Sequence, residues 1–343
     1  VYAYVYGVGS ANPYLFAYGG CPTTPRGPIV YRAVECRLAN SARFPAAMVA
    51  KQKIDMNGNS VTTDSYNSTD PTKSTGGAYD PAKRQPNGDI ASNDTVTNTV
   101  DIAIGNANIY GQVLVSPSGA VTMGPNGSIG PTLVEAERAR TISAAQSNGW
   151  LRNDFQVDIP DVVLPSGASS WPALPSTGTI TSGDYKGTSI NSSRIISGKV
   201  RIYLTGSRQS IKLTGNQSIT IMPGSSLIVY TDGDVDIAGN GVINDSVTPI
   251  NCQFYGVNTT SFKIAGNGVF VGCVYAPNAD LQIQGGGTNG DMAGAIVAKS
   301  ITMTGTTNFH YDESLREVGP GASYDIASWK SYRWTGGGWV ADN

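Results

Sequence analysis

Three acidic residues spaced two apart are the first candidate for chemistry in this sequence. Asp232, Asp234 and Asp236 alternate with Gly233 and Val235, and residues two apart point to the same side of a β-strand. Three carboxylates on one side could bind Ca²⁺, which takes six or more oxygen ligands. Because the outer side of such a strand is normally polar, we favour a solvated surface and expect no metal and no cofactor.

No set of residues indicates a catalytic site. His310 is the only histidine, and in its end segment we expect it to hydrogen-bond rather than to transfer protons. Thr302, Thr304 and Thr306 form one short row, whereas ice binding would need a flat array of threonines. We therefore predict that the protein is not an enzyme, with a polysaccharide lyase or hydrolase as the alternative.

The four cysteines are Cys21, Cys36, Cys252 and Cys273, and none forms a CxxC pair. A zinc site is therefore not indicated. Cys252 and Cys273 are about one repeat apart, and Cys21 and Cys36 flank the connection of a predicted hairpin. Two local disulfides would fit a secreted protein, and four buried thiols are the alternative.

Aromatic residues gather at both ends of the chain. Val1–Val8, Tyr14–Tyr18 and Ile29–Leu38 alternate aromatic or apolar residues and predict a small antiparallel sheet. An uncharged terminal strand can pair with an open sheet edge in its own molecule or in a neighbour. The residues expected to make contacts between subunits are Tyr2, Tyr4, Tyr6, Val8, Trp329, Trp334 and Trp339.

One short pattern returns through most of the chain: a small residue, an apolar run, a polar step, an alternating apolar triplet and a glycine. It occurs in Ser226–Gly239, Gly272–Gly285 and Gly294–Gly305, and it can also be aligned with Ala47–Gly58 and Gly111–Gly124. The closing glycines at 215, 239, 266, 285 and 305 are 19 to 27 residues apart, which is typical of one coil of a β-solenoid. Asparagine follows several of these glycines, and both types tolerate the left-handed backbone of a sharp turn.

The predicted fold is therefore all-β: a right-handed parallel β-solenoid (β-helix) with a small N-terminal antiparallel sheet and one short helical insertion. The handedness follows the general rule for parallel crossovers. The helix is expected after Thr132 as N-cap, with Glu135 three residues on, and residues 59–87 are expected to be loop. The expected segments are an N-terminal sheet (1–45), two solenoid parts (46–130 and 198–318), a helix and proline-rich connector (131–197) and a Trp-rich tail (319–343).

Composition points to an extracellular protein. Of 343 residues only 14% are charged, while 42 are glycine and 17 are tyrosine. The net charge of -2 and the lack of a basic patch argue against nucleic acid as a partner. No apolar window is long enough to span a membrane, and no signal peptide opens the chain, so a mature or trimmed form is expected.

Several ordered motifs resemble bacterial cell-surface β-solenoid proteins related to type IV pilus assembly and minor pilins. They are Tyr230–Gly241, Gly272–Leu281, Gly294–Ser300 and Phe309–Leu315, with Ser328-Trp329 at the end and Phe44–Lys51 with Asp64–Tyr66 at the start. The resemblance covers about residues 25 to 330. In that group the solenoid typically follows a hydrophobic pilin-like helix, which this chain does not contain, and there are no catalytic residues to carry over.

Together these observations predict an extracellular structural protein of the bacterial cell surface. We expect a self-assembling subunit of a surface filament or pilus-like appendage, whose main partner is a second copy of the chain. The alternative is a monomeric or tip-located adhesin that binds a glycan or a surface through tyrosine and tryptophan rings.

Overall fold

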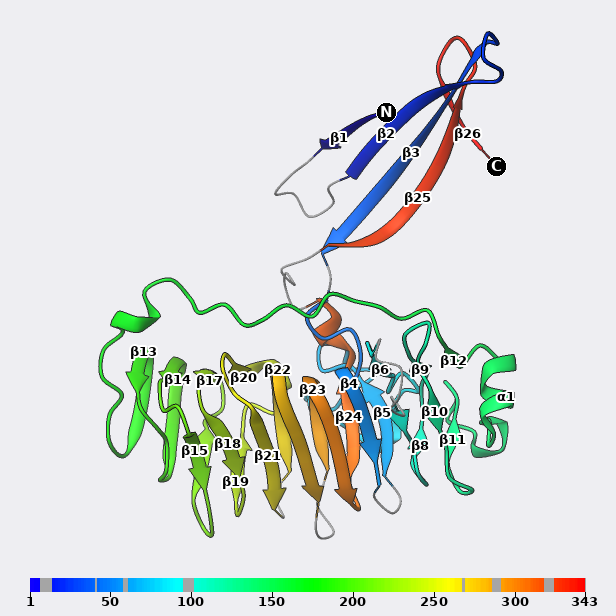
Figure 1. The fold of residues 1–343 in the computed structure, drawn as a ribbon. Coiled ribbons are helices and arrows are strands. Elements are labelled where there is room, and N and C mark those ends of the chain that lie inside the picture. Colours follow the sequence, from blue (N-terminus) through cyan, green and yellow to red (C-terminus); the bar gives the residue numbers. More distant parts are fainter. Residues whose placement is uncertain are drawn as a thin grey trace. The chain divides into compact units, whose positions relative to one another are not determined.

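The computed structural model describes residues 1–6, 14–40, 42–57, 61–94, 102–266, 269–285, 291–317 and 324–342. These residues are mostly β-structure, and the chain forms two compact units (Figure 1). Unit 1 combines Val1–Arg43 with Val318–Asn343, and unit 2 is Phe44–Glu317. The expected separation of an N-terminal sheet from a C-terminal tail is therefore wrong, because both belong to one unit. Among the described residues, no helix is both long and apolar enough for a membrane span.

Unit 1 is a single antiparallel sheet in the order β1-β2-β3-β25-β26. Its strands are β1 (Tyr2–Tyr6), β2 (Tyr14–Pro22), β3 (Ile29–Asn40), β25 (Tyr324–Trp334) and β26 (Trp339–Ala341). The tail joins this sheet because β25 pairs along β3, from Asn40 opposite Tyr324 to Arg32 opposite Arg333. The alternation of apolar residues in both segments provides the matching faces.

Unit 2 is one large sheet of parallel strands. Its first strands are β4 (Met48–Met56), β5 (Thr62–Tyr66), β6 (Ile90–Ser92), β7 (Ile102–Ala103), β8 (Asn108–Ile109), β9 (Val113–Leu114), β10 (Val121–Thr122), β11 (Ser128–Ile129) and β12 (Leu151–Arg152). The later strands are β13 (Thr179–Gly187), β14 (Arg194–Leu204), β15 (Gln209–Leu213), β16 (Ser218–Ile221), β17 (Ser226–Thr231), β18 (Asp234–Ile237), β19 (Gly241–Asn244), β20 (Cys252–Gly256), β21 (Ser261–Gly266), β22 (Phe270–Gly285), β23 (Met292–Gly305) and β24 (Asn308–Asp312). Short helices connect some of them: α1 (Ile142–Ser147) and the 3₁₀ turns η1 (Pro81–Lys83), η2 (Glu135–Glu137), η3 (Ala168–Ser170), η4 (Pro249–Asn251) and η5 (Glu313–Glu317).

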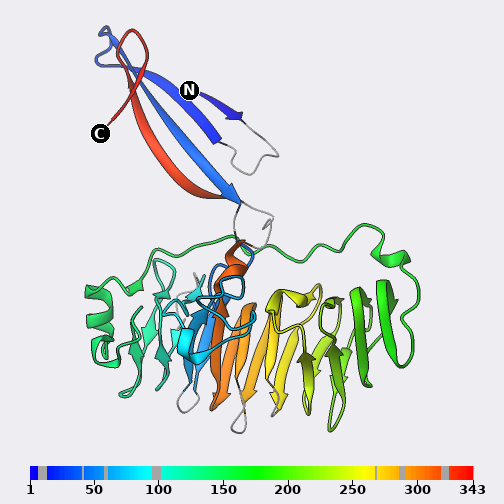
Figure 2. The same ribbon diagram turned by 180° about the vertical axis from the view of Figure 1, so that it is seen from behind.

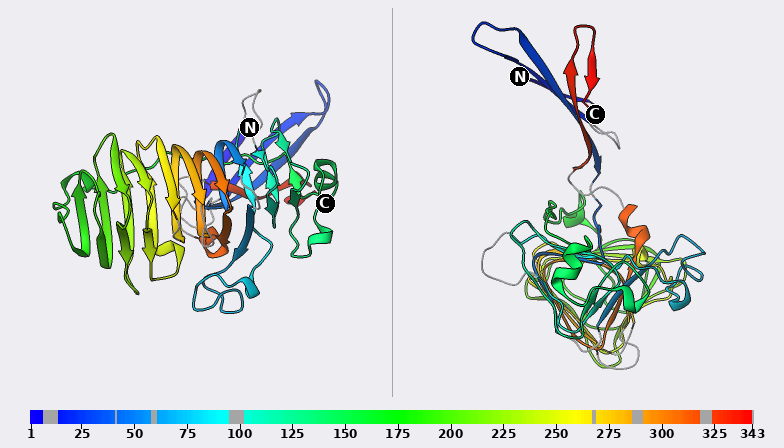
Figure 3. Two further views of the ribbon diagram at one scale, coloured as in Figure 1. Left: turned by 90° about the horizontal axis from the view of Figure 1, so that it is seen from below. Right: turned by 90° about the vertical axis from the view of Figure 1, so that its right-hand side faces the viewer.

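Many strands pair with the strand two or three elements later, which gives three rows of parallel strands. Examples are β14 with β17, β15 with β18 and β16 with β19. Figure 3 shows the strands following one another along one direction. Within a strand such as β18, Val235 and Ile237 are buried while Asp234 and Asp236 are partly exposed, so the predicted alternation is present. The closing glycines also stack, with Gly285 in register with both Gly266 and Gly305.

The order of the strands in space differs from their order in the sequence. The first strand of unit 2, β4, lies in the middle of the sheet and pairs in parallel with β23, near the C-terminal end of the unit. From β4 the chain proceeds to β12 at one end, crosses to β13 at the other end and returns to β23 and β24 (Figures 1 and 2). Residues 153–178 make this crossing with no strand of their own, as their prolines predict. The parallel sheet resumes at Thr179 instead of the expected residue 198.

Two further expectations are wrong. Residues 62–66 are the buried strand β5 and not loop, because the polar groups of Thr63, Asp64 and Ser65 find hydrogen-bond partners. The helix does not start at Thr132. Ile129 and Ala139 exchange backbone hydrogen bonds that restrict the intervening segment to the short 3₁₀ turn η2, so α1 begins after Thr141, whose hydroxyl caps the Ala144 N–H.

Candidate functional site

The most elaborate polar cluster lies where the two ends of unit 2 meet. We call this region the seam: β4 and β5 on one side, and β23 and β24 on the other, in register through pairs such as Val49 with Val297 and Asp64 with His310. Side chains on one face of the seam extend the backbone pairing. Asn308 receives a hydrogen bond from the Thr62 hydroxyl at 2.6 Å and donates one to Asp291 at 2.8 Å.

His310 is buried at the seam and forms an ion pair with Asp64. The distance from His310 Nδ1 to Asp64 Oδ1 is 2.5 Å, and the two residues are 4% and 2% exposed. Tyr79 covers the pair: its ring stacks on the imidazole with centroids 3.5 Å apart, and its hydroxyl donates to Asp64 Oδ2 at 2.8 Å. His310 Nε2 faces Asp291 Oδ2 at 3.9 Å, which is an ion-pair distance but too long for a hydrogen bond.

These surroundings favour the charged imidazole. Burial disfavours a positive charge on His310, but its interactions with the carboxylates of Asp291 and Asp64 outweigh burial and raise its pKa. The same interaction with His310 lowers the pKa of Asp291. Burial also raises the pKa of Tyr79, with the charge of Asp64 adding to the effect, so its hydroxyl remains a donor.

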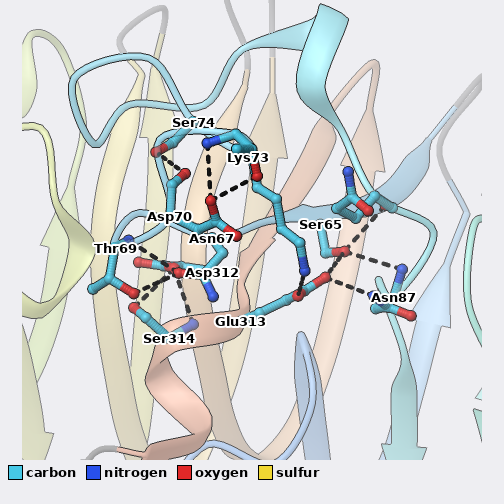
Figure 4. Close-up of polar contacts among 12 residues, drawn as sticks. Ser65, Asn67, Thr69, Asp70, Lys73, Ser74, Asn87, Asp312, Glu313 and Ser314 are labelled. Atoms are coloured by element: carbon cyan, nitrogen blue, oxygen red, sulfur yellow. Dashed lines mark hydrogen bonds and ion pairs between the residues drawn. The ribbon is translucent and has the colours of Figure 1, made fainter.

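A second cluster follows directly in β24 and η5 (Figure 4). Asp312 is fully buried, and its Oδ1 accepts hydrogen bonds from the backbone N–H groups of Ser68 and Ser314 and from the Ser314 hydroxyl. Glu313 Oε1 accepts from the Ser65 hydroxyl at 2.8 Å and from Asn87 Nδ2 at 2.6 Å. Because Ser65, Ser68 and Asn87 are among the donors, these carboxylates tie the start of unit 2 to its end.

Two lysines of the segment 65–87 make polar contacts at this cluster and in the loop beside it. Lys73 Nζ lies 3.5 Å from Glu313 Oε2, and Lys83 Nζ donates to the carbonyl oxygens of Pro71 and Ser74. No group of three or more His, Cys, Asp or Glu among the described residues is arranged to hold a metal ion. Among the described residues, the Nε2 atom of His310 has no hydrogen-bond partner. The seam is therefore suited to joining the two ends of unit 2.

The three aspartates considered for Ca²⁺ bind different neighbours. Asp232 accepts hydrogen bonds from the Tyr203 hydroxyl and from Asn258. Asp234 accepts from the backbone and hydroxyl of Thr260 and from the backbone of Ser261. Asp236 lies in register between Lys212 and Lys263. The structure therefore does not bring them together as a calcium site.

The four cysteines are free thiols, contrary to the predicted disulfides. Cys21 lies opposite Val30 and Cys36 lies opposite Leu15, so six residues of β2, about 20 Å, separate their positions. Cys252 and Cys273 do occupy neighbouring strands, and both are buried. Burial raises the pKa of both thiols, which keeps them protonated.

The predicted assembly residues lie in unit 1, except that Val8 lies outside the described residues. Tyr2, Tyr4 and Tyr6 are register partners of Tyr18, Phe16 and Tyr14, and the Tyr6 and Tyr14 rings stack 4.7 Å apart. Trp334 and Trp339 also pack edge to face across β25 and β26. Trp329, by contrast, is 68% exposed.

Sequence reasoning missed a ladder of tyrosines on four successive strands. Tyr203, Tyr230, Tyr255 and Tyr275 are in register, and the Tyr230 and Tyr255 rings stack 5.2 Å apart. The Tyr275 hydroxyl donates to the Pro160 carbonyl at 2.7 Å, which anchors the crossing segment. The sequence contains a signal for this ladder, because an apolar residue directly precedes each of the four tyrosines. Thr302 shows no such ladder, since its register partners are Gln282 and Asp55.

Comparison with known proteins gives one family match. Residues 174–318 match the family described as domain of unknown function DUF7305, and a search of the curated proteins finds no match. Among solved structures, the chain is similar to the ice-binding protein_1 DUF3494 domain of Shewanella frigidimarina, with 12% identity and a TM-score of 0.29 over 80% of this chain and 99% of that one. It is also similar to the competence-associated pilin ComZ of Thermus thermophilus, with 8% identity and a TM-score of 0.31 over 94% of this chain and 82% of that one. At these scores neither likeness defines a function.

Proposed function

We propose that this chain is an extracellular structural protein of the bacterial cell surface that self-associates as the repeating subunit of a filament or pilus-like appendage. In this proposal it has no catalytic role. Unit 2 is a rigid body and unit 1 supplies the contacts between copies. The observation that carries the proposal is that unit 1 is a single-layered sheet with large apolar side chains exposed on both faces.

Alternation along the strands assigns these side chains to the two faces. One face carries aromatic rings, including Tyr2, Tyr4 and Trp334, which are 63%, 45% and 44% exposed. The other face carries aliphatic residues and Trp329, and Val5 on it is 55% exposed. Several large exposed apolar side chains on one small sheet are typical of an interaction site.

For unit 2 we propose a right-handed parallel β-solenoid. The three rows of strands support this, because strands such as β14 and β17 recur on the same row after two strands on other rows. Stacked glycines at the corners provide the turns between rows. Such a body is stiff and elongated and is suited to a structural role.

Negative-stain electron microscopy of residues 1–343, with light scattering after size exclusion, tests the proposal. We expect oligomers or filaments whose abundance increases with concentration, and we expect loss of these species when residues 1–8 are deleted. The deletion variant should keep the thermal unfolding transition of unit 2. A protein that stays monomeric across the concentration range would overturn the proposal.

A second candidate function is a monomeric adhesin. The exposed rings of Trp329 and Trp334 favour it, because tyrosine and tryptophan faces stack on sugar rings. Glycan-array binding by the monomer, lost on Trp329→Ala together with Trp334→Ala, would support this function over self-assembly.

A further inference from the structure

The outer edge of β1 is an open strand edge in unit 1. In the sheet order β1 is terminal, and among the described residues only β2 pairs with it. All five of its residues are exposed. A terminal strand presents unpaired N–H and C=O groups that readily accept another strand.

Features that normally protect an edge are missing from β1. Its sequence, Tyr-Ala-Tyr-Val-Tyr, has no charged residue and no proline, and its pairing with β2 has no bulge. The opposite edge is formed by β26, which spans only three residues and is followed by Asp342, and by the part of β25 that β26 does not pair with. That part of β25 carries the charged residues Asp325 and Lys330, which protect an edge against strand addition. The difference points to β1 as the edge that takes a partner strand.

The β1 sequence is self-complementary in antiparallel pairing. When two copies align about their central residues, Tyr4 lies opposite the partner's Tyr4, Tyr2 lies opposite the partner's Tyr6, and Ala3 lies opposite the partner's Val5. Each tyrosine then meets a tyrosine on one face, and each small apolar residue meets another on the other face. A shift by one residue would put tyrosines opposite alanine and valine and break this match.

Within the chain, β1 already pairs this way on its inner side. Its three tyrosines lie opposite aromatic residues of β2, and Ala3 and Val5 lie opposite Ala17 and Leu15. A second β1 would therefore extend both the aromatic and the aliphatic face without a change of register. A two-fold axis perpendicular to the sheet keeps the matching faces of both copies on the same side.

We infer that two copies of the chain pair through β1 to form a continuous ten-stranded antiparallel sheet. The inference rests on the proposed self-association and specifies one of its contacts. Since a two-fold contact closes on itself, a filament needs a second contact elsewhere on the subunit.

Paired charge substitutions at positions 3 and 5 test the register. In Ala3→Lys/Val5→Lys, each lysine faces a lysine of the partner, whereas in Ala3→Lys/Val5→Glu each faces the opposite charge. Within the chain these positions face only the uncharged Ala17 and Leu15, so neither variant is expected to disturb β2. We expect the dimer Kd of the Lys/Lys variant to exceed that of the Lys/Glu variant by about tenfold to a hundredfold, from two cross-strand pairs per dimer.

Sedimentation velocity at low salt measures the two constants, and cross-linking gives a second readout. In a background with Cys21→Ser and Cys36→Ser, which removes the two thiols that are not buried, Tyr4→Cys should oxidise to a covalent dimer, because position 4 faces itself across the axis, whereas Ala3→Cys should not. Equal association of the Lys/Lys and Lys/Glu variants, or equal cross-linking of both cysteine variants, would overturn β1 pairing while leaving self-association intact. A monomeric wild-type chain would overturn both.

Discussion

His310 and Asp64 face each other across the seam with Nδ1 and Oδ1 2.5 Å apart. The raised pKa of His310 makes the stability of unit 2 depend on pH. The charged His310 stabilises the folded state fully below its pKa in the unfolded chain, which is about 6.5. This stabilisation is lost as pH rises through the higher pKa that His310 has in the folded protein. We expect the free energy of unfolding to fall over this range in the wild-type protein and to stay flatter in His310→Gln. Urea denaturation between pH 5.5 and 9 measures the difference, and parallel curves for the two proteins would contradict it.

Glu313 joins residues 65–87 to the C-terminal end of unit 2. Glu313→Ala removes the acceptor of Ser65 and Asn87 and the partner of Lys73. We expect it to destabilise the protein by about 2–3 kcal/mol, because hydrogen bonds to a charged group are lost and part-buried donors remain. Glu317→Ala in the same 3₁₀ turn is the control, since that residue is exposed and should change stability by less than about 0.5 kcal/mol. Similar losses for both variants would contradict the assigned role of Glu313.

The corner glycines differ in the space around them. Gly215 and Gly239 both have left-handed backbone angles, with φ of 57° and 69°. A Cβ at Gly239 would overlap the carbonyl oxygen of Gly215, whereas a Cβ at Gly215 meets nothing within 4 Å. We expect Gly215→Ala to lower the free energy of unfolding by about 1–2 kcal/mol, from backbone strain alone. Gly239→Ala should lower it by about 2 kcal/mol more, because of the added overlap. Equal melting temperatures for the two variants would argue against stacked corners.

Thiol accessibility tests the cysteine assignment. In the folded protein without reductant, Cys21 should react rapidly with a thiol reagent, while Cys252 and Cys273 should not react. In denaturant all four should react. Fewer than four reactive thiols in the denatured protein would show that a disulfide is present.

The crossing segment should detach first under proteolysis. Asn93 binds it twice, with its side-chain amide donating to the Val157 carbonyl and accepting from the Val157 N–H. Asn93→Ala should increase cleavage of residues 153–165 by chymotrypsin or Asp-N about tenfold, which corresponds to about 1.4 kcal/mol of local opening. Asn191→Ala, at an exposed position, is the control. Unchanged cleavage would mean that other contacts hold the segment.

Strand pattern and corner chemistry were predictable because they are local. The alternation around Val235 and the glycines at 285 and 305 follow from rules that act over a few residues. Pairing of β4 with β23 was not predictable in the same way, because the repeat in Ala47–Gly58 fits any neighbouring coil equally well. The interactions between residues 62–87 and Asn308–Glu313 help to fix that choice, and no spacing rule connects such distant segments.

A hydrogen-bonded His310 was expected, but its partners could not be predicted because they are individually ordinary residues. Asp64 lies in a polar run that resembles loop, and it becomes a buried ion pair only when β24 is placed beside it. The helix at Thr132 was wrong for a related reason: the bridge between Ile129 and Ala139 is tertiary and overrides local propensity. The aromatic residues of unit 1 were identifiable because their alternation is strict.

The central position of β4 has a consequence for biosynthesis. A ribosome releases β4 and β5 early, but their neighbours β23 and β24 emerge only after the rest of unit 2 has been made. The nascent chain therefore exposes an unpaired strand edge through most of translation, and we expect closure of the seam to be the last folding event of this unit. A chaperone that shields that edge would be needed most for this protein when it is almost completely synthesised.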